Sequence, residues 1–243
     1  PIFIATNGTI SVGDATIGIE ALCLEEDSAK DVEKASDHTI YNLSRLGIPL
    51  IEIATGPQIY EPEQAKDVAA YLGMVLRSLE NTKRGIGTIR QDVNVSIAKG
   101  MRVEIKGAQD LKLIPELVKS EMLRQHNLLE IFKELKKREA SIGSLDNITS
   151  LLKTSESKVV QRGLENDGVA LAIALKGFKG LLGMQIQPGR RFGSELSDYA
   201  KVMGVKGLFH SDELPNYGIT QEEKNIIIRK LNLEENDAFI LII

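Results

Sequence analysis

The alternation of apolar and polar residues over 89–106 is the pattern that most constrains how this chain can fold. Val93, Val95 and Ile97 alternate with polar residues, and the alternation resumes after a short loop that ends in Gly100. An alternating run on each side of a three-residue, glycine-containing loop predicts an antiparallel β-hairpin. One face of this hairpin should be buried, and the other should be polar.

The polar face of the predicted hairpin carries charged or hydrogen-bonding side chains, which are Asp92, Asn94, Ser96, Arg102, Glu104 and Lys106. If Ile97 pairs with Met101, Asp92 lies opposite Lys106, and Asn94 lies opposite Glu104. Such neighbours commonly form ordinary cross-strand pairs, each worth about 0.2–1 kcal/mol. A polar sheet face can also line a binding site, although the pattern alone favours ordinary pairing.

Two apolar runs, 15–24 and 50–54, are predicted strands, and carboxylates accompany both of them. Glu52 is unusual, because aliphatic residues flank it on both sides in Pro-Leu-Ile-Glu-Ile-Ala. A carboxylate in such surroundings loses solvation unless it is paired, hydrogen-bonded or bound to a metal. If Glu25 or Glu26 shares this space, two carboxylates in one apolar pocket require a cation.

Two longer segments have helical periodicity and are predicted to form the scaffold of this part of the chain. Residues 62–80 begin with Pro62, which suits the first turn of a helix, and residues 114–138 form a longer helix. The polar segment 31–38 is expected to be a loop. The outer face of the second helix carries Lys112, Lys119, Arg124, Lys133, Lys136, Lys137 and Arg138. A charged helix face is more often solvated than bound to RNA.

The rest of the chain is predicted to contain a linker and a second, smaller domain, so the first domain should end near residue 140. Residues 141–165 are weakly periodic and rich in Ser, Thr and Gly, which indicates a linker with one short helix. Residues 166–243 alternate short strands with helices and predict a compact α/β unit. The expected strands are 169–175, 207–210 and 238–243, and the expected helices are 194–203 and 221–231.

Nothing in this second domain indicates catalysis. Arg190 and Arg191 lie in a glycine-rich loop and could bind phosphate, but no P-loop or dinucleotide fingerprint surrounds them. His210 is followed by Ser211 and Asp212. A Ser–His–Asp set so close in sequence is no triad without supporting geometry, so we assign it no catalytic role.

The composition excludes several classes of protein. The net charge is −4, so any RNA contact depends on local basic patches rather than on a generally basic surface. Cys23 is the single cysteine, which excludes an intrachain disulfide and fits a reducing compartment. No run approaches the roughly 20 apolar residues of a membrane span, and no signal-peptide pattern occurs, so a cytoplasmic protein is expected. The chain opens on Pro1 and closes on the aliphatic run 240–243, which favours an internal fragment.

Four motifs occur in order along the first half of the chain. They are Leu24-Glu-Glu-Asp-Ser-Ala-Lys30, Gly47-Ile-Pro-Leu-Ile-Glu-Ile53, Arg90-Gln-Asp-Val-Asn-Val-Ser96 and Arg102-Val-Glu-Ile-Lys106. In these motifs the chain resembles the B/E-subunit family of tRNA-dependent amidotransferases, and it departs from the B-type pattern at Gln91, Val93 and Gly107. Residues 166–243 resemble a domain that such subunits share with bacterial-type aspartyl-tRNA synthetases. That combination is typical of the archaeal E-type members.

The resemblance implies a fold and a reaction. The implied fold is α+β: part of the family's catalytic (cradle) domain, with antiparallel strands and flanking helices, followed by a small insertion domain. The implied reaction is ATP-dependent conversion of Glu-tRNA(Gln) to Gln-tRNA(Gln). The glutamyl side chain is phosphorylated with ATP and Mg²⁺, and ammonia from an asparaginase-like D subunit then displaces the phosphate. A hetero-oligomer that binds tRNA(Gln) is therefore expected.

The resemblance also implies roles for individual residues. Glu26 and Glu52 are the expected metal ligands, with Glu25 and Asp27 as neighbours. The expected contacts to the phosphates of ATP or of the intermediate are Lys30, Arg45 and Lys106. Asp92, Asn94 and Glu104 are expected to line the same polar site. The family's N-terminal Glu-x-His segment and its C-terminal tRNA-binding region are missing from this sequence, so the chain is expected to be inactive alone.

Two other interpretations compete with this one. The chain could be a non-catalytic tRNA-binding or assembly module, in which the acidic residues serve only structural pairing. Residues 166–243 could also be a synthetase fragment, but no class II synthetase ATP motif occurs in the chain. The positions of Glu26 and Glu52 help to separate the catalytic interpretation from the non-catalytic module. One ion can bridge the two carboxylates only if they lie close together.

Overall fold

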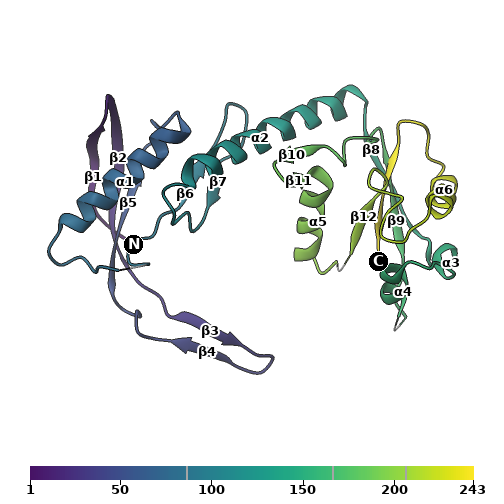
Figure 1. Cartoon of the computed structure of the whole chain (residues 1–243), viewed down its shortest axis with the longest axis horizontal. Helices are drawn as coiled ribbons and strands as arrows, with labels where there is room; N and C mark the ends of the chain where they lie inside the picture. The colour runs from purple at the N-terminus through teal and green to yellow at the C-terminus, as the bar shows by residue number, and fades with distance from the viewer. Residues whose placement is uncertain (86, 166, 206) are drawn as a thin grey trace. The chain divides into compact units, whose positions relative to one another are not determined.

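The computed structural model describes residues 1–85, 87–165, 167–205 and 207–243. The chain divides into two compact units. Unit 1 consists of Pro1–Val93 and Ile105–Val118, and unit 2 consists of Asn94–Glu104 and Lys119–Ile243. Figure 1 labels the helices and strands along the chain.

Unit 1 contains a three-stranded antiparallel sheet in the order β1-β2-β5. Its strands are β1 (Ile2–Val12), β2 (Ala15–Glu26) and β5 (Pro49–Thr55), so both predicted strands are confirmed. A second hairpin, β3 (Lys30–Lys34) and β4 (Thr39–Asn42), lies between β2 and β5 in sequence. The predicted loop at 31–38 is therefore wrong for residues 31–34, which lie in β3, while residues 35–38 connect the two strands as a loop. Its polar residues misled the periodicity argument because both faces of this hairpin are largely exposed.

The predicted helix of unit 1 is present, and so is the predicted hairpin, most of which belongs to unit 2. Helix α1 (Pro62–Ser78) has proline in its first turn, where the missing N–H would have no helical partner. The predicted hairpin is present as a two-stranded sheet of β6 (Val93–Val95) and β7 (Val103–Ile105). Its strands are shorter than the alternating pattern, and the pairing of Ile97 with Met101 stays a prediction.

Unit 2 is built on a four-stranded sheet in the order β12-β13-β9-β8. Its strands are β8 (Ser141–Asn147), β9 (Leu171–Lys176), β12 (Leu208–His210) and β13 (Ala238–Ile242). Every neighbouring pair is antiparallel. Because its strands are antiparallel, the small domain is classed as α+β, whereas the alternation of strands and helices predicted a compact α/β unit. The α+β fold expected for the whole chain is confirmed.

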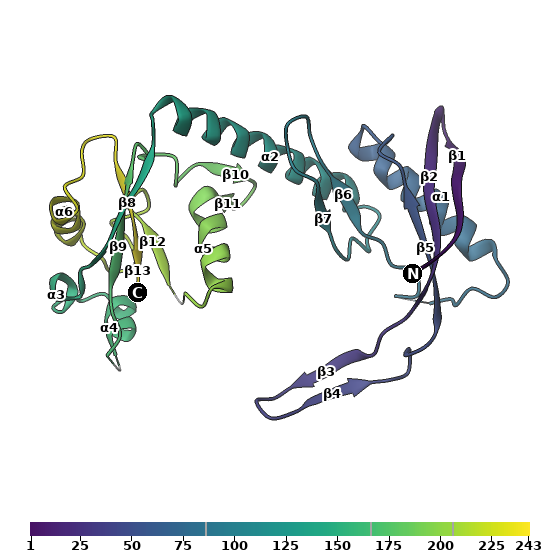
Figure 2. The same cartoon turned by 180° about the vertical axis from the view of Figure 1, so that it is seen from behind.

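Helices cover both faces of this sheet. Alternation along β13 sends Phe239 and Leu241 to one apolar core and Ala238 and Ile240 to the other. The first core also receives residues of α3 (Thr149–Leu152), α4 (Lys158–Leu164) and α6 (Gln221–Lys230), and the second receives residues of α5 (Phe192–Val202). Figures 1 and 2 show α5 on one side of the sheet and α3, α4 and α6 on the other. The central strand is thus buried on both faces, which explains its uninterrupted apolar sequence.

The predicted linker at 141–165 is wrong, because this segment belongs to the core of unit 2. It forms the edge strand β8 and the helices α3 and α4. Ile148, Leu152 and Val160 are fully buried in the first core. Short elements of four and seven residues are too brief to display helical periodicity, so their sequence resembled a linker.

Helix α2 (Ile114–Lys137) matches the predicted long helix. Its basic face is less uniform than the sequence suggested, because the Arg124 side chain is only 15% exposed and is paired with two carboxylates. Arg138, just after the helix, donates to the carbonyl oxygens of Gly177 and Lys179. Among the described residues, no helix combines the length and apolar character that a bilayer crossing requires.

Candidate functional site: a carboxylate held between two arginines

The buried carboxylate of unit 1 is Asp27, which directly follows β2 and is 5% exposed. Its Oδ2 accepts a hydrogen bond from Nε of Arg45 at 2.9 Å, and its Oδ1 accepts one from Nη2 of Arg90 at 3.1 Å. The backbone N–H of Ser28 also donates to Oδ1, at 3.0 Å. The backbone of Asp27 is held as firmly, because its N–H donates to Ile48 and its carbonyl accepts from Gly47. The end of β2 therefore fixes the position of this carboxylate.

These contacts bring together the first three motifs of the sequence. Asp27 comes from the first motif, Arg90 opens the third, and Arg45 lies two residues before the second. We refer to Asp27, Arg45 and Arg90 as the arginine clamp. From the sequence, Arg45 was a predicted phosphate contact and Asp27 only a neighbour of the predicted metal ligands, while Arg90 was not predicted to have a role. The available signal was charge complementarity between the conspicuous acidic triplet and an arginine that begins a motif.

The clamp stays ionised and carries a net positive charge. Burial raises the pKa of Asp27, but the hydrogen bonds and charges of Arg90 and Arg45 outweigh this effect and hold the pKa below its usual value. One carboxylate thus faces two guanidinium groups. The side chains of Arg45 and Arg90 are 39% and 44% exposed, so each retains donors that solvent or a ligand can reach. Guanidinium groups held in this way suit an anion with several oxygens, such as a phosphate.

Glu52 does not occupy the apolar setting that its sequence neighbours suggested. Its side chain is exposed, and the adjacent Ile51 is 48% exposed. The expectation of a desolvated carboxylate at this position is therefore wrong. The sequence misled the argument because an aliphatic run does not reveal that this strand has an exposed face.

The register of β2 and β5 separates the two predicted metal ligands. Glu52 lies opposite Cys23, whereas Glu26 lies opposite Pro49, three positions further along β2. Because side chains alternate between the faces of a strand, Glu26 and Glu52 project from opposite faces of this ladder. Glu25 instead shares the face of Glu52, as its diagonal neighbour.

No group of three or more acidic, histidine or cysteine side chains suited to a metal occurs within the described ranges. A carboxylate and the phosphates of a nucleotide can nevertheless hold Mg²⁺ together, because this ion retains water and commonly uses only one or two protein carboxylates. The donor chemistry of Glu25 and Glu52 fits that mode of binding.

The polar face of the β6–β7 hairpin is exposed as predicted. Its four selected side chains, Asp92, Asn94, Glu104 and Lys106, are all exposed, while Val95 is buried. Asp92 accepts a hydrogen bond from the backbone N–H of Gly107 at 2.8 Å. Gly107 has a φ of +73°, a conformation that glycine adopts without strain, which accounts for one departure from the B-type motif.

A second departure, Gln91, joins the two segments at the base of the hairpin. Its side-chain amide donates to the carbonyl of Ala108 at 2.7 Å, and the N–H of Ala108 donates back to the carbonyl of Gln91. Lys30 has a different setting. It is exposed at the start of β3, opposite Asn42, on the hairpin that follows Asp27.

Among its described residues, the second unit offers a buried histidine but no catalytic Ser–His–Asp set. Burial lowers the pKa of His210, outweighing the opposing charges of Glu213 and Asp212 and adding to the effect of Arg191. Within the described part of the chain, Nδ1 of His210 has no hydrogen-bond partner, and Nε2 lies 3.8 Å from Glu213. Asp212 accepts from two backbone N–H groups instead. Arg190 of the glycine-rich loop is paired with Glu195 and Asp198.

Comparison with known proteins gives two family matches along the chain. Residues 1–169 match the model of the GatB/GatE catalytic domain, and residues 160–243 match that of the GAD domain. The second match begins inside the segment that we predicted to be a linker, which agrees with the burial of that segment in unit 2.

Curated relatives are similar over nearly the whole chain. It is 50% identical to the E-type subunit of the glutamyl-tRNA(Gln) amidotransferase of Methanocaldococcus jannaschii, over 99% of this chain and 39% of the relative. The corresponding proteins of Pyrococcus furiosus and Methanosarcina acetivorans are 51% and 50% identical, over 98% and 99% of this chain and 38% of each relative. The chain thus spans about two fifths of the length of these relatives. From these matches, the chain belongs to the GatB/GatE family, with the family's catalytic domain followed by a GAD domain.

Proposed function

We propose that this chain forms part of the catalytic core of an enzyme that converts Glu-tRNA(Gln) to Gln-tRNA(Gln) with ATP. The γ-phosphoryl group of ATP is transferred to the glutamyl side-chain carboxylate, which releases ADP. Ammonia then attacks the activated carbonyl carbon and displaces inorganic phosphate. The names of the relatives and their 50% identity to this chain support the proposal.

The arginine clamp is the observation that carries this proposal. Phosphoryl transfer depends mainly on positioning and on neutralising charge at the transferred group, and arginines serve both purposes. Arg45 and Arg90 are aimed by one buried carboxylate, Asp27, so their guanidinium groups are ordered before any ligand binds. We assign Arg45 and Arg90 to the phosphates and Asp27 to the orientation of both.

Mg²⁺ would supply a second positive charge next to the phosphates. We propose Glu52 as one of its ligands and Glu25, on the same face of the β2–β5 ladder, as a second. Glu26, at the end of β2, is the alternative to this pair. Lys30 and Lys106 are proposed as further phosphate contacts. Asp92, Asn94 and Glu104 are proposed to line the polar side of the site through the exposed face of the hairpin.

The proposed assembly supplies what the chain does not contribute. An asparaginase-like D subunit would produce the ammonia, and regions beyond the two fifths represented here would complete the grip on tRNA(Gln). The enzyme would therefore work as a hetero-oligomer.

The test uses the full-length protein assembled with its ammonia-producing partner. ADP formation that depends on Glu-tRNA(Gln) is measured for Arg45→Met, Arg90→Met and the control Arg77→Met, which removes an exposed arginine near the end of α1. Each clamp variant should lower the rate by about 100-fold or more, because each removes a guanidinium from the transferred phosphoryl group. The control should stay close to wild type.

Binding of tRNA, measured on the same variants, separates this function from the competing one. Loss of ADP formation with unchanged tRNA affinity supports the catalytic role. Normal ADP formation in both clamp variants would reject the assignment and would favour a non-catalytic tRNA-binding or assembly module.

A further inference from the structure

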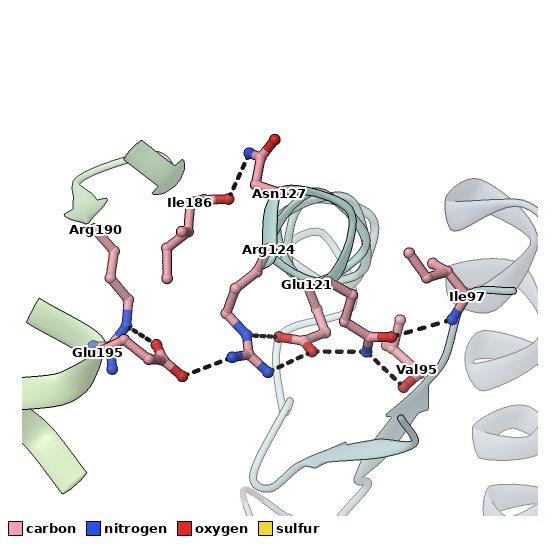
Figure 3. Close-up of polar contacts among 9 residues, drawn as sticks. Val95, Ile97, Glu121, Arg124, Asn127, Ile186, Arg190 and Glu195 are labelled. Carbon is pink, nitrogen blue, oxygen red and sulfur yellow. Dashed lines mark hydrogen bonds and ion pairs between the residues drawn. The ribbon is translucent and has the colours of Figure 1, made fainter. Parts of the chain in front are cut away.

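A polar seam lies buried along one face of α2 in unit 2. Glu121, Arg124 and Gln125 are three and four residues apart, so they share one face of the helix. All three side chains are largely buried, although a helix this rich in charge would ordinarily turn such residues to solvent. Figure 3 shows that the contacts of this seam continue toward the β6–β7 hairpin on one side and toward α5 on the other.

At the hairpin end, Gln125 holds the turn that follows β6. Its Oε1 accepts from the N–H of Ile97 at 3.2 Å, and its Nε2 donates to the carbonyl of Val95 at 3.2 Å. Gly100 allows this close approach, since a Cβ at that position would lie 2.2 Å from Oε1 of Gln125. The oxygen and the nitrogen of the Gln125 amide therefore both bind the backbone, one on each side of Ser96.

In the middle of the seam, Glu121 couples Gln125 to Arg124. Oε1 of Glu121 accepts from Nε2 of Gln125 at 2.8 Å and from Nη2 of Arg124 at 3.0 Å. Oε2 accepts from Nε of Arg124 at 2.7 Å. Because one carboxylate oxygen serves both donors, a displacement of the guanidinium changes the acceptor on which the Gln125 amide depends.

At the other end, Arg124 is tied to the first turn of α5. Its Nη1 donates to Oε1 of Glu195 at 2.6 Å (Figure 3). The second oxygen of Glu195 accepts from Nε of Arg190 at 2.7 Å, and Arg190 also pairs with Asp198. Glu195 is itself buried. Along the seam, Glu121, Arg124, Glu195 and Arg190 alternate in charge. Each of these buried or partly buried charges therefore has at least one neighbour of opposite charge.

We propose that Arg124 of α2 and Glu195 of the GAD part of the chain are positioning residues that set the conformation of the Val95–Ile97 turn. Glu195 holds the Arg124 guanidinium, Arg124 holds the Glu121 carboxylate, and that carboxylate holds the Gln125 amide against the turn. Asn94, a member of the third motif, directly precedes this turn. The catalytic consequence rests on the proposed function, whereas the conformational consequence does not.

A buried charge that loses its partner is unfavourable, so the neighbouring groups must rearrange. In Glu195→Gln the carboxylate charge is removed, and Arg124 loses one of its two anionic partners. In Arg124→Met the Glu121 carboxylate loses its cation, and Glu195 keeps Arg190 as its only cationic partner among the contacts of the seam. The rearrangement should pass along the seam to the hydrogen bond between Gln125 and the N–H of Ile97.

Amide hydrogen exchange at Ile97 in the full-length protein provides the first test. Glu195→Gln and Arg124→Met should each speed this exchange by about tenfold or more, although neither substituted residue touches Ile97. Glu130→Gln is the matched control, because it removes a carboxylate from the same helix whose ion pair with Lys133 is exposed. In the control, the rate of amide exchange at Ile97 should stay within about twofold of wild type.

Kinetics of the assembled enzyme provide the second test. A displaced turn should lower kcat by about tenfold while KM for ATP changes little, since the clamp that is proposed to bind phosphate is intact. Arg124→Lys keeps the charge but cannot bridge both carboxylates, so it should resemble Arg124→Met rather than wild type. Global destabilisation would instead speed exchange throughout the sheet of unit 2.

The outcomes separate the two proposals. Unchanged exchange at Ile97 in both seam variants would overturn the positioning role, whatever the activity. Faster exchange at Ile97 with normal turnover would preserve the structural coupling but would show that the turn does not serve catalysis, and that part of the inference would fall. Failure of the arginine-clamp variants to affect ADP formation would reject the proposed function and leave the exchange result intact.

Discussion

Replacing Gly193 with alanine tests whether a close approach inside unit 2 is as tight as the structure indicates. Gly193 is the second residue of α5 and is buried. A Cβ at this position would lie 2.2 Å from Cδ2 and 2.3 Å from Nε2 of His210, and 3.1 Å from the carbonyl oxygen of Leu182. Non-bonded carbon atoms prefer a separation of about 3.5–4.0 Å, so the imidazole ring or the helix must shift by more than about 1 Å.

Neither group can move without losing contacts. The N–H of Gly193 donates to the carbonyl of Leu182 at 2.8 Å, and the His210 residue is only 4% exposed, so its ring is packed on all sides. Inserting a methyl group into such a site costs about 1–3 kcal/mol. Alanine favours the helix by at most about 1 kcal/mol, so a net loss of about 1–2 kcal/mol is expected. This corresponds to a decrease of roughly 4–8 °C in the melting temperature of unit 2.

Gly73→Ala is the matched control, because the same substitution should have the opposite sign there. Gly73 lies inside α1, and its added Cβ would meet only the flexible end of the Arg77 side chain, at 3.2 Å. The gain in helix propensity should stabilise unit 1 by about 0.5–1 kcal/mol. Urea unfolding followed by circular dichroism, with hydrogen exchange to assign each transition to its unit, measures both effects. A Gly193→Ala protein as stable as wild type would refute the packing argument.

Acid should destabilise unit 2 through His210, because its lowered folded pKa means that the unfolded state gains a proton first as the pH falls. The free energy of unfolding should therefore decrease below about pH 6.5, by at most about 1.4 kcal/mol per pH unit, and His210→Gln should reduce this slope. Asp27 has a different window: its pKa is lowered, so its contribution is complete above about pH 3.9 and is lost only as the pH falls through the lower folded value. In urea unfolding, Asp27→Asn should accordingly reduce the pH dependence of the free energy of unfolding only in strong acid. For the metal, calorimetric titration of the assembled enzyme with Mg²⁺ and ATP should show weaker binding for Glu25→Gln and Glu52→Gln by about tenfold, and a smaller loss for Glu26→Gln. Equal losses in all three would contradict the assignment of faces.

Periodicity was most informative where one element presents a long and consistent face to the core. The predicted helices 62–80 and 114–138 correspond to α1 and α2 within two residues at each end. In unit 2 the predicted strand 238–243 and helix 221–231 are equally close to β13 and α6. These segments bury the side chains that create the pattern, so the pattern survives in the folded chain.

The same reasoning failed where local sequence does not reveal burial. Residues 31–34 lie in the first strand of an exposed hairpin whose polar composition resembles a loop. Residues 141–165 enter a core through elements too short to be periodic. Glu52 resembled a buried carboxylate because its neighbours are aliphatic, yet it is exposed. Arg124 resembled a solvated cation, yet it is largely buried between carboxylates.

The order of motifs along the chain was sufficient to identify the family and to direct attention to the acidic triplet, because motif identity is a local property of sequence. It was not sufficient to choose which acid is buried. Asp27 rather than Glu52 is the buried carboxylate, since the chain reverses after β2 and returns with Arg45, while the segment before β6 brings in Arg90. Those partners are 18 and 63 residues away from Asp27. Partners so distant in sequence are joined only by the three-dimensional path of the backbone, and that path sets which charges are desolvated and which remain free to meet a ligand.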